Sequence, residues 1–539
     1  MLLPSLLTEP FVSPPVPAQS SAYDIVEFAV DAGESFANPF DPDEVAVDGT
    51  FSLEDGTRLV LPAYWDGKGF RLRFCPTRPG EWTLLTEIKT ARGVRRAPIR
   101  RFHVAPSSAP GFVRPSEKSW RYFRQDDGTS FVPIGLNLCW PDDRRLASYD
   151  ARFAKLKSVG GNFARIWTTQ ENRLENERVG LGRFDEKAAE FYDGLFRLAM
   201  KHGIRTMWTF DDYRVLAKTD FFNAHWDTSP YNVANGGPLR EPTDFFDSAE
   251  AQRLYKRKLR YLVARYAAFP SIAFWELWNE QDHIPKPGVP IGWFREMTEA
   301  LRGLDPYKHV VTTSYSWDDK AEVWESPAVG LTQRHMYGQG DTVDFVGEIA
   351  KNAAKMDRFR KPHLIGEFGI TWKEPDIALD KGKLGTPLHD ALWSSLMTGH
   401  AGGALTWWWD NYLEPLDLWP VFTGISRFVA GIDFANREFQ PLSVSVPGLE
   451  AMAMRDATSG ETLLWLHDPA SNWQNDAKGV APREWTDVSV AVPGTAKRVA
   501  EVWDTRRGEI VKRLELTPAR GQLNIPLPAF QRDIAVRLR

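Results

Sequence analysis

The chain has 539 residues, which is too long for one ordinary hydrophobic core, so we expect two to four domains. Hydrophobic residues make up 43% of it and charged residues 25%, as in globular proteins, and 66 basic against 71 acidic side chains leave a net charge of −5. This balance gives no electrostatic reason to expect nucleic acid or an anionic membrane surface as a partner.

The first 22 residues, MLLPSLLTEPFVSPPVPAQSSA, form a predicted N-terminal arm. The arm has no basic leader, and Pro4 and Glu9 interrupt its short apolar run, so it is a poor secretory signal. No apolar run in the sequence is long enough to span a bilayer. We therefore predict a cytoplasmic protein, or a secreted one if a leader has been removed.

Residues 23–106 contain short alternating runs such as VEFAVDA and EWTLLTEI, separated by Gly, Pro and Asp. This pattern predicts an Ig-like β-sandwich, and the Pro/Ser linker APSSAPGF follows it at 105–112. Trp65 and Trp82 suit a sandwich core as well as a sugar face, and we interpret the domain as a scaffold.

The region 115–440 alternates strand and helix and predicts a (β/α)₈ barrel, flanked by β-sandwiches on both sides. Its eight apolar runs are 131–140, 162–169, 205–212, 271–280, 309–317, 329–338, 363–369 and 403–410. Residues 441–539 return to short β runs such as ETLLWLHD and predict the C-terminal β-sandwich. Cys75 and Cys139 fall in different predicted domains, so we expect no disulfide.

Polar and aromatic residues gather at the ends of nearly all these strands, where barrel enzymes carry their active sites. In strand order they are Asn137 and Trp140, Arg165 and Trp167, Asp211 and Asp212, Asn279 and Glu280, His335 and Tyr337, Glu367, and Trp407 to Asp410. The sequence therefore predicts a site at this end of the barrel.

Glu280 and Glu367 end the fourth and seventh strands, and facing carboxylates across a cleft perform glycosidic-bond cleavage. Glu276 lies four residues before Glu280, so it sits roughly 13 Å deeper along the strand. We predict that Glu276 is a buried structural acid with a basic partner, either Arg165 or Arg205.

The neighbours of the two glutamates suggest how each is tuned. Arg165 and Tyr337 are placed to lie near Glu367 and keep it ionised, as a nucleophile requires. Trp278 and the apolar wall are expected to favour the neutral form of Glu280, as a general acid requires. Asn279 is positioned to contact a substrate hydroxyl beside the reacting carbon.

The connection after the third strand, about 213–250, is unusually long and therefore a candidate functional loop. Its aromatic residues either wall or extend the cleft, with Trp226 as a candidate contact, or pack together as a miniature core. The loop also carries Tyr213, Phe221, Phe222 and Tyr231. Further rim candidates are Asp142, Asp143, Trp317 and Trp419.

Other chemistries find no support in the sequence. There is no HExxH motif and no Cys/His cluster, so we expect no metal and no cofactor, and there is no GxSxG elbow or phosphate loop. His335 is a candidate site residue because it shares its strand end with Tyr337, although a hydrogen-bonded core histidine fits nearly as well. The basic run 255–266 has apolar positions at helical spacing, which predicts an outer barrel helix with a solvated face.

The set WNE at 278–280, GEFG at 366–369, HMY at 335–337, Arg165 and the Trp cluster resembles clan A of the glycoside hydrolases, closest to family 5-like cellulases and β-mannanases. RFCPTRPGEWTL at 73–84 is similar to an uncharacterised β-sandwich domain that precedes such barrels in bacteria. The resemblance covers most of the chain, most weakly at the C-terminal domain.

The resemblance implies a retaining mechanism, with Glu280 as acid/base and Glu367 as nucleophile. It also implies that Asn279 binds the 2-hydroxyl and that a strand-eight tryptophan stacks on the sugar. The triple Trp407-Trp408-Trp409 departs from the family's single Trp, and period two places Trp407 and Trp409 on one side, of which we favour Trp407.

The leading hypothesis is a retaining hydrolase of β-linked oligo- or polysaccharides. A transglycosylase on the same scaffold is the second hypothesis, and a catalytically silent carbohydrate-binding protein is the third. The presence of both glutamates argues against the third hypothesis.

Overall fold

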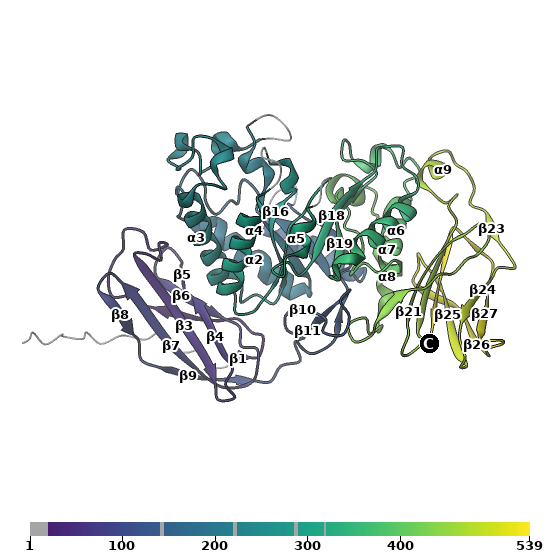
Figure 1. The fold of residues 1–539 in the computed structure, drawn as a ribbon, viewed down its shortest axis with the longest axis horizontal. Helices are drawn as coiled ribbons and strands as arrows, with labels where there is room; N and C mark the ends of the chain where they lie inside the picture. The colour runs from purple at the N-terminus through teal and green to yellow at the C-terminus, as the bar shows by residue number, and fades with distance from the viewer. Residues whose placement is uncertain (1–19, 141–144, 219–223, 285–288, 317–319) are drawn as a thin grey trace, which may run out of the picture.

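A computed structural model describes residues 20–140, 145–218, 224–284, 289–316 and 320–539. Figure 1 shows an N-terminal β domain on one side of a central part of strands and helices, and a second β domain on the other side. Within the described ranges no helix combines the length and apolarity needed to cross a membrane. Cys75 and Cys139 are both buried free thiols, so the expectation of no disulfide is confirmed.

The N-terminal β domain consists of two facing sheets. One follows the order β1-β9-β7-β3-β4, with β8 paired to β7, and the other follows β2-β6-β5. Its strands are β1 Ser20–Ser21, β2 Val26–Val30, β3 Val45–Leu53, β4 Arg58–Pro62, β5 Tyr64–Trp65, β6 Phe70–Phe74, β7 Gly80–Thr90, β8 Gly93–Arg96 and β9 Arg100–Ala105. Alternate residues of β3 and β7 are buried, and Phe51, Phe74 and Trp82 pack between the sheets.

A small antiparallel sheet links this domain to the central part, and seven parallel strands follow it. The linking strands are β10 Val113–Pro115, β11 Phe123–Gln125 and β12 Ser130–Phe131. The parallel strands are β13 Gly135–Asn137, β14 Phe163–Trp167, β15 Arg205–Asp212, β16 Ile272–Asn279, β17 Val310–Thr312, β18 Thr332–Tyr337 and β19 His363–Gly369. Strands β13 to β17 form one sheet in sequence order, and β18 pairs with β19.

Backbone hydrogen bonds connect the two parallel sheets on both sides. Thr406 forms parallel bridges to Leu136 of β13 and to Phe368 of β19. On the other side, Gly330 donates to the Val311 carbonyl over 3.0 Å and His335 donates to the Tyr315 carbonyl over 3.1 Å. The run predicted as the eighth strand, 403–410, hydrogen-bonds to both neighbours: Leu405 and Trp407 donate to the Ile365 and Phe368 carbonyls, and the Thr406 carbonyl accepts from Asn137 N. The prediction fails only at the end of the run, where the chain turns into a π-helix, Trp409–Leu413.

Helices follow most of the parallel strands. The α-helices of the central part are α1 Leu146–Ser158, α2 Glu186–His202, α3 Ala249–Tyr266, α4 Ile291–Leu304, α5 Ala321–Glu325, α6 Phe345–Met356, α7 Thr386–Met397 and α8 Val421–Val429. Shorter 3₁₀ turns are η1 Tyr213–Leu216, η2 Trp226–Thr228, η3 Val233–Asn235, η4 Pro242–Asp244, η5 Gln281–His283, η6 Asp357–Phe359 and η7 Asp376–Ala378. Helix α2 shows how local chemistry sets the ends: the Asp185 side chain accepts from Ala188 N at its start, and Gly203 ends it with φ +66°.

The basic helix α3 is solvated only in part: the Lys256 side chain is 42% exposed, but other basic side chains of the helix contact another domain. Arg257 pairs with Asp41, and Arg260 pairs with Asp48 over 2.7 Å, so this face docks on the N-terminal β domain. From the other side of that interface the buried Arg73 reaches the Asp193 carboxylate over 2.6 Å. The predicted helix is therefore confirmed, but carboxylates of the N-terminal and central domains pair with several of its basic side chains.

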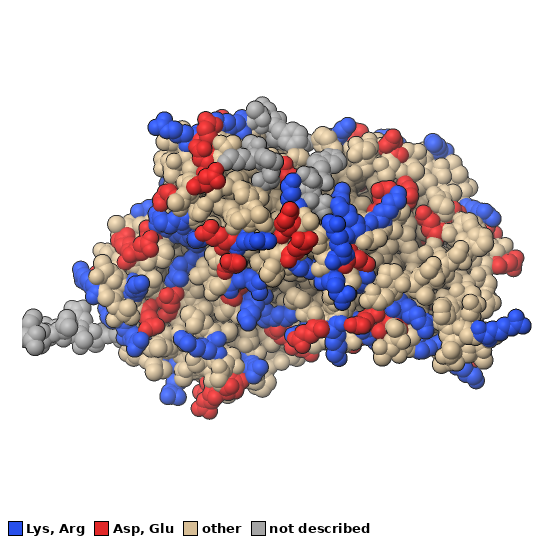
Figure 2. All heavy atoms as spheres, in the orientation of Figure 1, with Lys and Arg blue, Asp and Glu red and all other residues tan. Residues whose placement is uncertain are grey.

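The C-terminal domain is again built of strands. One sheet follows the order β20-β21-β22-β29-β25-β26, and β23-β28 and β24-β27 are separate pairs. The bounds are β20 Phe439–Pro441, β21 Glu450–Asp456, β22 Thr462–His467, α9 Trp473–Ala477, β23 Glu484–Trp485, β24 Ser489–Pro493, β25 Arg498–Asp504, β26 Glu509–Leu516, β27 Gln522–Pro526, β28 Phe530–Gln531 and β29 Asp533–Leu538. Figure 2 shows acidic and basic side chains intermingled over the visible face of the molecule, as a net charge of −5 leads one to expect.

Candidate active site

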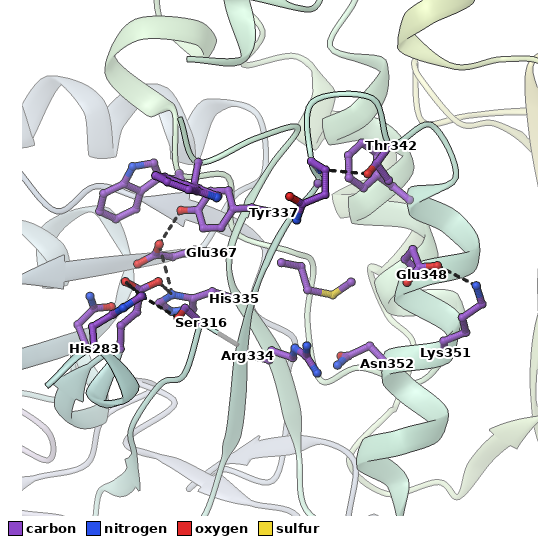
Figure 3. Close-up of a pocket in the computed structure, with 18 of the residues that line it drawn as sticks. His283, Ser316, Arg334, His335, Tyr337, Thr342, Glu348, Lys351, Asn352 and Glu367 are labelled. Carbon is purple, nitrogen blue, oxygen red and sulfur yellow. Dashed lines mark hydrogen bonds and ion pairs between the residues drawn. The ribbon is translucent and has the colours of Figure 1, made fainter. Parts of the chain in front are cut away.

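A cavity of about 900 Å³ opens at the carboxyl ends of β16, β18 and β19. Six of the predicted site residues line it: Asn279, Glu280, His335, Tyr337, Glu367 and Trp407. They come from strands that are far apart in the sequence, and Figure 3 shows Tyr337, His335 and Glu367 turned toward one another. The parallel arrangement brings them together because every strand ends at the same edge.

Arg165, at the end of β14, organises the base of this cavity and has no exposed surface. Its guanidinium has five N–H groups, and the structure gives each a partner. Nε and Nη2 donate to the Glu276 carboxylate over 2.7 and 2.9 Å, and Nη2 also donates to Asn279 Oδ1 over 2.7 Å. Nη1 donates to Glu367 Oε1 over 2.6 Å and to Asn137 Oδ1 over 3.1 Å. With every donor engaged, Arg165 positions other residues and does not itself face the cavity.

Glu276 is the buried structural acid that its depth predicts, and its basic partner is Arg165. Thr209 Oγ1 and Gln333 Nε2 also donate to its carboxylate, over 2.7 and 3.1 Å. Burial alone would raise the pKa of Glu276, but the Arg165 guanidinium and these donors outweigh it and lower the pKa. Arg205 lies at the other end of its strand, where it donates to Gly111 O and Gln125 Oε1.

Glu367 is held by donors on both carboxylate oxygens. Arg165 occupies Oε1, and the Tyr337 hydroxyl donates to Oε2 over 2.6 Å. Burial raises the pKa of Glu367 above its ordinary value, while His335, Arg165 and the Tyr337 hydrogen bond oppose the rise. The predicted contacts of Arg165 and Tyr337 with Glu367 are thus present, and both oppose the rise in its pKa that desolvation causes.

His335 bridges the two glutamates. Its Nδ1 lies 2.8 Å from Glu280 Oε1 and 3.3 Å from Glu367 Oε2. Burial lowers the pKa of His335 to about 4, against the opposing charge of Glu367, so the ring is neutral at pH 7. A neutral ring with its proton on Nδ1 donates to one carboxyl at a time, and it can follow the charge from one glutamate to the other.

Glu280 lies just beyond β16 in a strained conformation. Its φ of +45° is in the left-handed region, which a residue with a Cβ rarely adopts, and Ser314 Oγ accepts from its backbone N over 3.0 Å. Burial raises the pKa of Glu280 to about 7, with His283 acting in the opposite direction. The predicted neighbour Trp278 is not the cause, because its ring packs against Tyr255 and Trp293 on the outer side of the strand.

Asn279 and Trp407 complete the group that faces the cavity. Asn279 Oδ1 accepts hydrogen bonds from Arg165 and from Ser314 Oγ. These bonds fix the orientation of the amide, and its Nδ2 has no hydrogen-bond partner among the described residues. Trp407 is half-buried with its ring 5.7 Å from that of Trp140. Trp409 is 2% exposed and donates Nε1 to the Trp140 carbonyl, so it supports this wall from behind.

Three predicted site residues lie away from the cavity. Asn137 is fully buried and donates Nδ2 to Gly366 O, Leu405 O and Thr406 O, which ties β13 to its neighbours. Asp211 is held by the Lys258 ammonium over 2.6 Å. Trp226 is 3% exposed within the long loop.

The rest of the long loop and the rim candidates complete the comparison with prediction. Tyr231 of this loop packs on Phe245, as a miniature core would, whereas Tyr213 lines the cavity. Trp419 is buried and donates to Glu414 Oε2 over 2.7 Å. Asp142, Asp143, Trp317, Phe221 and Phe222 lie outside the described residues.

The cavity also contains residues that the sequence analysis did not name. His283, Ser316, Arg214, Arg334 and Trp372 line it. Ser316 is the last residue but one of the fifth apolar run, so its position near a strand end was a signal that could have identified it. The others lie on turns or on the outer side of β18, where periodicity gives no signal.

Glu280, His335 and Glu367 place one ligand atom each within 4.8 Å of one another, which is a spacing that a metal ion could use. The donor set fits poorly, because Arg165 and Tyr337 already occupy both oxygens of Glu367 at 2.6 Å. A cation there would also lie beside the buried guanidinium of Arg165. These contacts favour the prediction of no metal.

Comparisons with known proteins find relatives among the glycoside hydrolases. The "Probable mannan endo-1,4-beta-mannosidase F" of Aspergillus oryzae is 26% identical over 250 residues, which cover 42% of this chain and 48% of that protein. The "Mannan endo-1,4-beta-mannosidase F" of Aspergillus clavatus is 24% identical over 313 residues, covering 50% and 66%. The chain thus spans about half to two thirds of the length of these curated relatives.

The chain is similar to glycoside hydrolases in sequence and in fold. A crystal structure of a "putative glycoside hydrolase" from Bacteroides vulgatus shares the fold, with a TM-score of 0.66, 14% identity and coverage of 97% of this chain and 99% of that one. Residues 19–89 match a domain family described only as a domain of unknown function, DUF5060. The predicted resemblance to glycoside hydrolases is therefore confirmed, and the multidomain arrangement agrees with the B. vulgatus structure.

Proposed function

We propose that this protein is a retaining β-glycoside hydrolase whose catalytic domain, residues 115–440, is a closed (β/α)₈ barrel. The observation that carries the proposal is the spacing of Glu280 and Glu367. One carboxylate oxygen of each residue lies within 4.8 Å of one from the other, across the cavity. Retaining glycosidases hold their two carboxyl groups about 5–5.5 Å apart, whereas inverting enzymes need about 6.5–9.5 Å to admit a water.

The environments of the two glutamates assign their roles. Glu280, with its pKa raised to about 7, carries the proton and donates it to the leaving oxygen, while a Glu367 oxygen attacks the anomeric carbon. The bond to the leaving sugar breaks as the glycosyl ester to Glu367 forms. Glu280, now ionised, then takes a proton from water, whose oxygen displaces Glu367 and releases the product with the original anomeric configuration.

The surrounding residues support these steps. Charge moves from Glu367 to Glu280 in the first step, and the His335 Nδ1 proton lies within reach of both carboxylates. Asn279 Nδ2 is available to a hydroxyl beside the reacting carbon, and the Trp407 indole offers a flat face for the sugar ring. The flanking domains, residues 23–106 and 441–539, act as scaffolds.

The substrate we propose is a β-1,4-mannan or a mannooligosaccharide, because the curated relatives are mannan endo-1,4-beta-mannosidases by name. The test compares wild type with Glu367→Ala on aryl β-mannosides and defined mannooligosaccharides, with parallel β-glucosides. The control is Asp211→Asn, which changes a strand-end carboxylate outside the cavity.

We expect Glu367→Ala to lose activity by about 10⁴-fold or more, since it removes the nucleophile. Azide should restore turnover and give the α-glycosyl azide, while Asp211→Asn stays active. An inverted wild-type product, or a Glu367→Ala variant as active as wild type, would refute the mechanism. A larger yield of longer sugars on addition of an acceptor would identify a transglycosylase on the same scaffold.

A further inference from the structure

A second cavity, of about 830 Å³, lies at the opposite end of the central strands from the active site. Its walls come from three parts of the chain that are distant in sequence. The N-terminal domain supplies Tyr23 and Arg78, the small linking sheet supplies Arg114 and Arg124, and the segment between α4 and β17 supplies Lys308 with its neighbours. Because β17 begins at Val310, this cavity opens at the amino ends of the strands. Ligand sites in proteins often form at such domain boundaries and have volumes of about 300–1,000 Å³.

Cationic side chains outnumber carboxylates on the walls of this cavity, and Arg114 pairs with Asp126 over 2.8 Å. Five cationic side chains line it, and Asp126 is the one carboxylate among its described lining residues. The cations are Arg78, Arg114, Arg124, Arg302 and Lys308. The acids that pair with Arg78 and Arg124, Asp55 and Glu117, are not lining residues, and Glu117 is 81% exposed.

Several donors in the cavity remain available to a ligand. Arg302 gives Nη1 to the Pro327 carbonyl over 2.9 Å, and its other N–H groups have no partner among the described residues. Lys308 likewise has no acid partner in the described part of the chain, and its backbone is held at φ +55°.

The remaining walls are flat and apolar. Tyr23, Pro115, Pro306 and Pro327 present ring surfaces beside the cationic groups. A volume of about 830 Å³ is far larger than an inorganic anion needs. Flat apolar walls next to guanidinium groups suit a ligand that has both a sugar ring and a negative charge.

We propose that this interdomain cavity binds an acidic saccharide, independently of the catalytic cavity. Arg302 and Lys308 bind its carboxylate or phosphate, and the ring surfaces contact its sugar. The same chemistry is offered by a uronic-acid unit of a glycan and by a sugar phosphate.

The test measures binding to the full-length chain by calorimetry, at low ionic strength and at physiological salt. The probes are a hexuronate disaccharide, glucose 6-phosphate, inorganic phosphate and a neutral disaccharide. The variants are Lys308→Gly, which keeps the left-handed backbone, and Arg302→Gln. Lys383→Gly is the matched control, because Lys383 has a φ of +56° and lies outside the cavity.

We expect one acidic saccharide to bind, more weakly at higher salt, and about tenfold more weakly in Lys308→Gly and Arg302→Gln than in wild type or Lys383→Gly. The saccharide that binds identifies the source of the anion. Three results would overturn the proposal: inorganic phosphate binding as tightly as glucose 6-phosphate, which means an adventitious ion only; equal binding of the neutral disaccharide; and binding that neither cavity variant changes.

Discussion

Replacing Glu280 by Gln should stabilise the folded protein at alkaline pH, although it removes the proposed general acid of catalysis. The carboxyl is buried at the rim of the cavity, and burial raises its pKa from 4.5 to about 7. Between these values the folded protein keeps a proton that the unfolded chain has already released. Stability therefore falls as the pH rises through this window, and the whole loss is present above pH 7.

The magnitude follows from the shift. Each pKa unit corresponds to about 1.4 kcal/mol, so the buried carboxylate costs about 3 kcal/mol at pH 8 and almost nothing at pH 4. Gln is nearly isosteric with Glu and keeps an oxygen for His335, but it carries no charge. For a cooperative unit of roughly 300 residues, the gain at pH 8 amounts to an increase in Tm of roughly 5 °C.

Calorimetric unfolding of wild type and Glu280→Gln at pH 4, 6 and 8 measures this difference. Glu276→Gln is the matched comparison, because it makes the same chemical change four residues earlier, inside β16, where Arg165 lowers the carboxyl pKa. It removes one of the two carboxylates that pair with the buried Arg165 and should destabilise by about 3 kcal/mol at neutral pH. A stability gain for Glu280→Gln that is the same at pH 4 and pH 8 would refute the reasoning.

Three further predictions concern the other charged groups. Tyr337→Phe removes a hydrogen bond that lowers the Glu367 pKa, so the acid limb of the kcat profile should move to higher pH, and an unshifted limb would show that this bond does not tune Glu367. Dialysis against EDTA should leave activity unchanged and mass spectrometry should find no stoichiometric metal; a retained ion with loss of activity on its removal would reverse this expectation. Arg73→Ala removes the ion pairs of Arg73 with Asp193 and Glu27 and should destabilise the protein by about 3 kcal/mol or more in denaturant unfolding. The control Arg96→Ala, at an exposed ion pair, should cost about 1 kcal/mol or less. Equal losses for the two variants would contradict a role for Arg73 as a buried contact between domains.

The residues at the strand ends were accessible to sequence reasoning because a parallel strand has a direction. A buried run that ends in a polar pair, such as Asn279-Glu280, places that pair at the rim, and this rule also indicated Glu367 and Tyr337. The same rule named Asp211, which lies outside the cavity beside Lys258. The side on which a strand-end residue faces depends on the twist and register of its neighbours, which one strand's sequence does not contain.

Ion pairs between residues far apart in the chain could not be predicted from the sequence for the same reason. Nothing in the spacing of residues 253–260 shows that α3 turns its arginines toward Asp41 and Asp48 of another domain. The run 403–410 has the apolar character of a strand, yet tertiary packing of its tryptophans converts its end into a π-helical turn.

The sequence by itself determined the β character of both flanks, the alternation of strands and helices between them, and the two glutamates at strand ends. These features follow from local periodicity and from the chain direction of each strand. Three features were decided only by the tertiary structure. Arg165 donates all five N–H groups to neighbouring side chains, and His335 lies within reach of the Glu280 and Glu367 carboxyls. The backbone of Glu280 adopts a left-handed conformation. Such contacts are set by groups that approach within about 3 Å across more than 50 residues of sequence, and a distance of that kind exists only once the chain has folded.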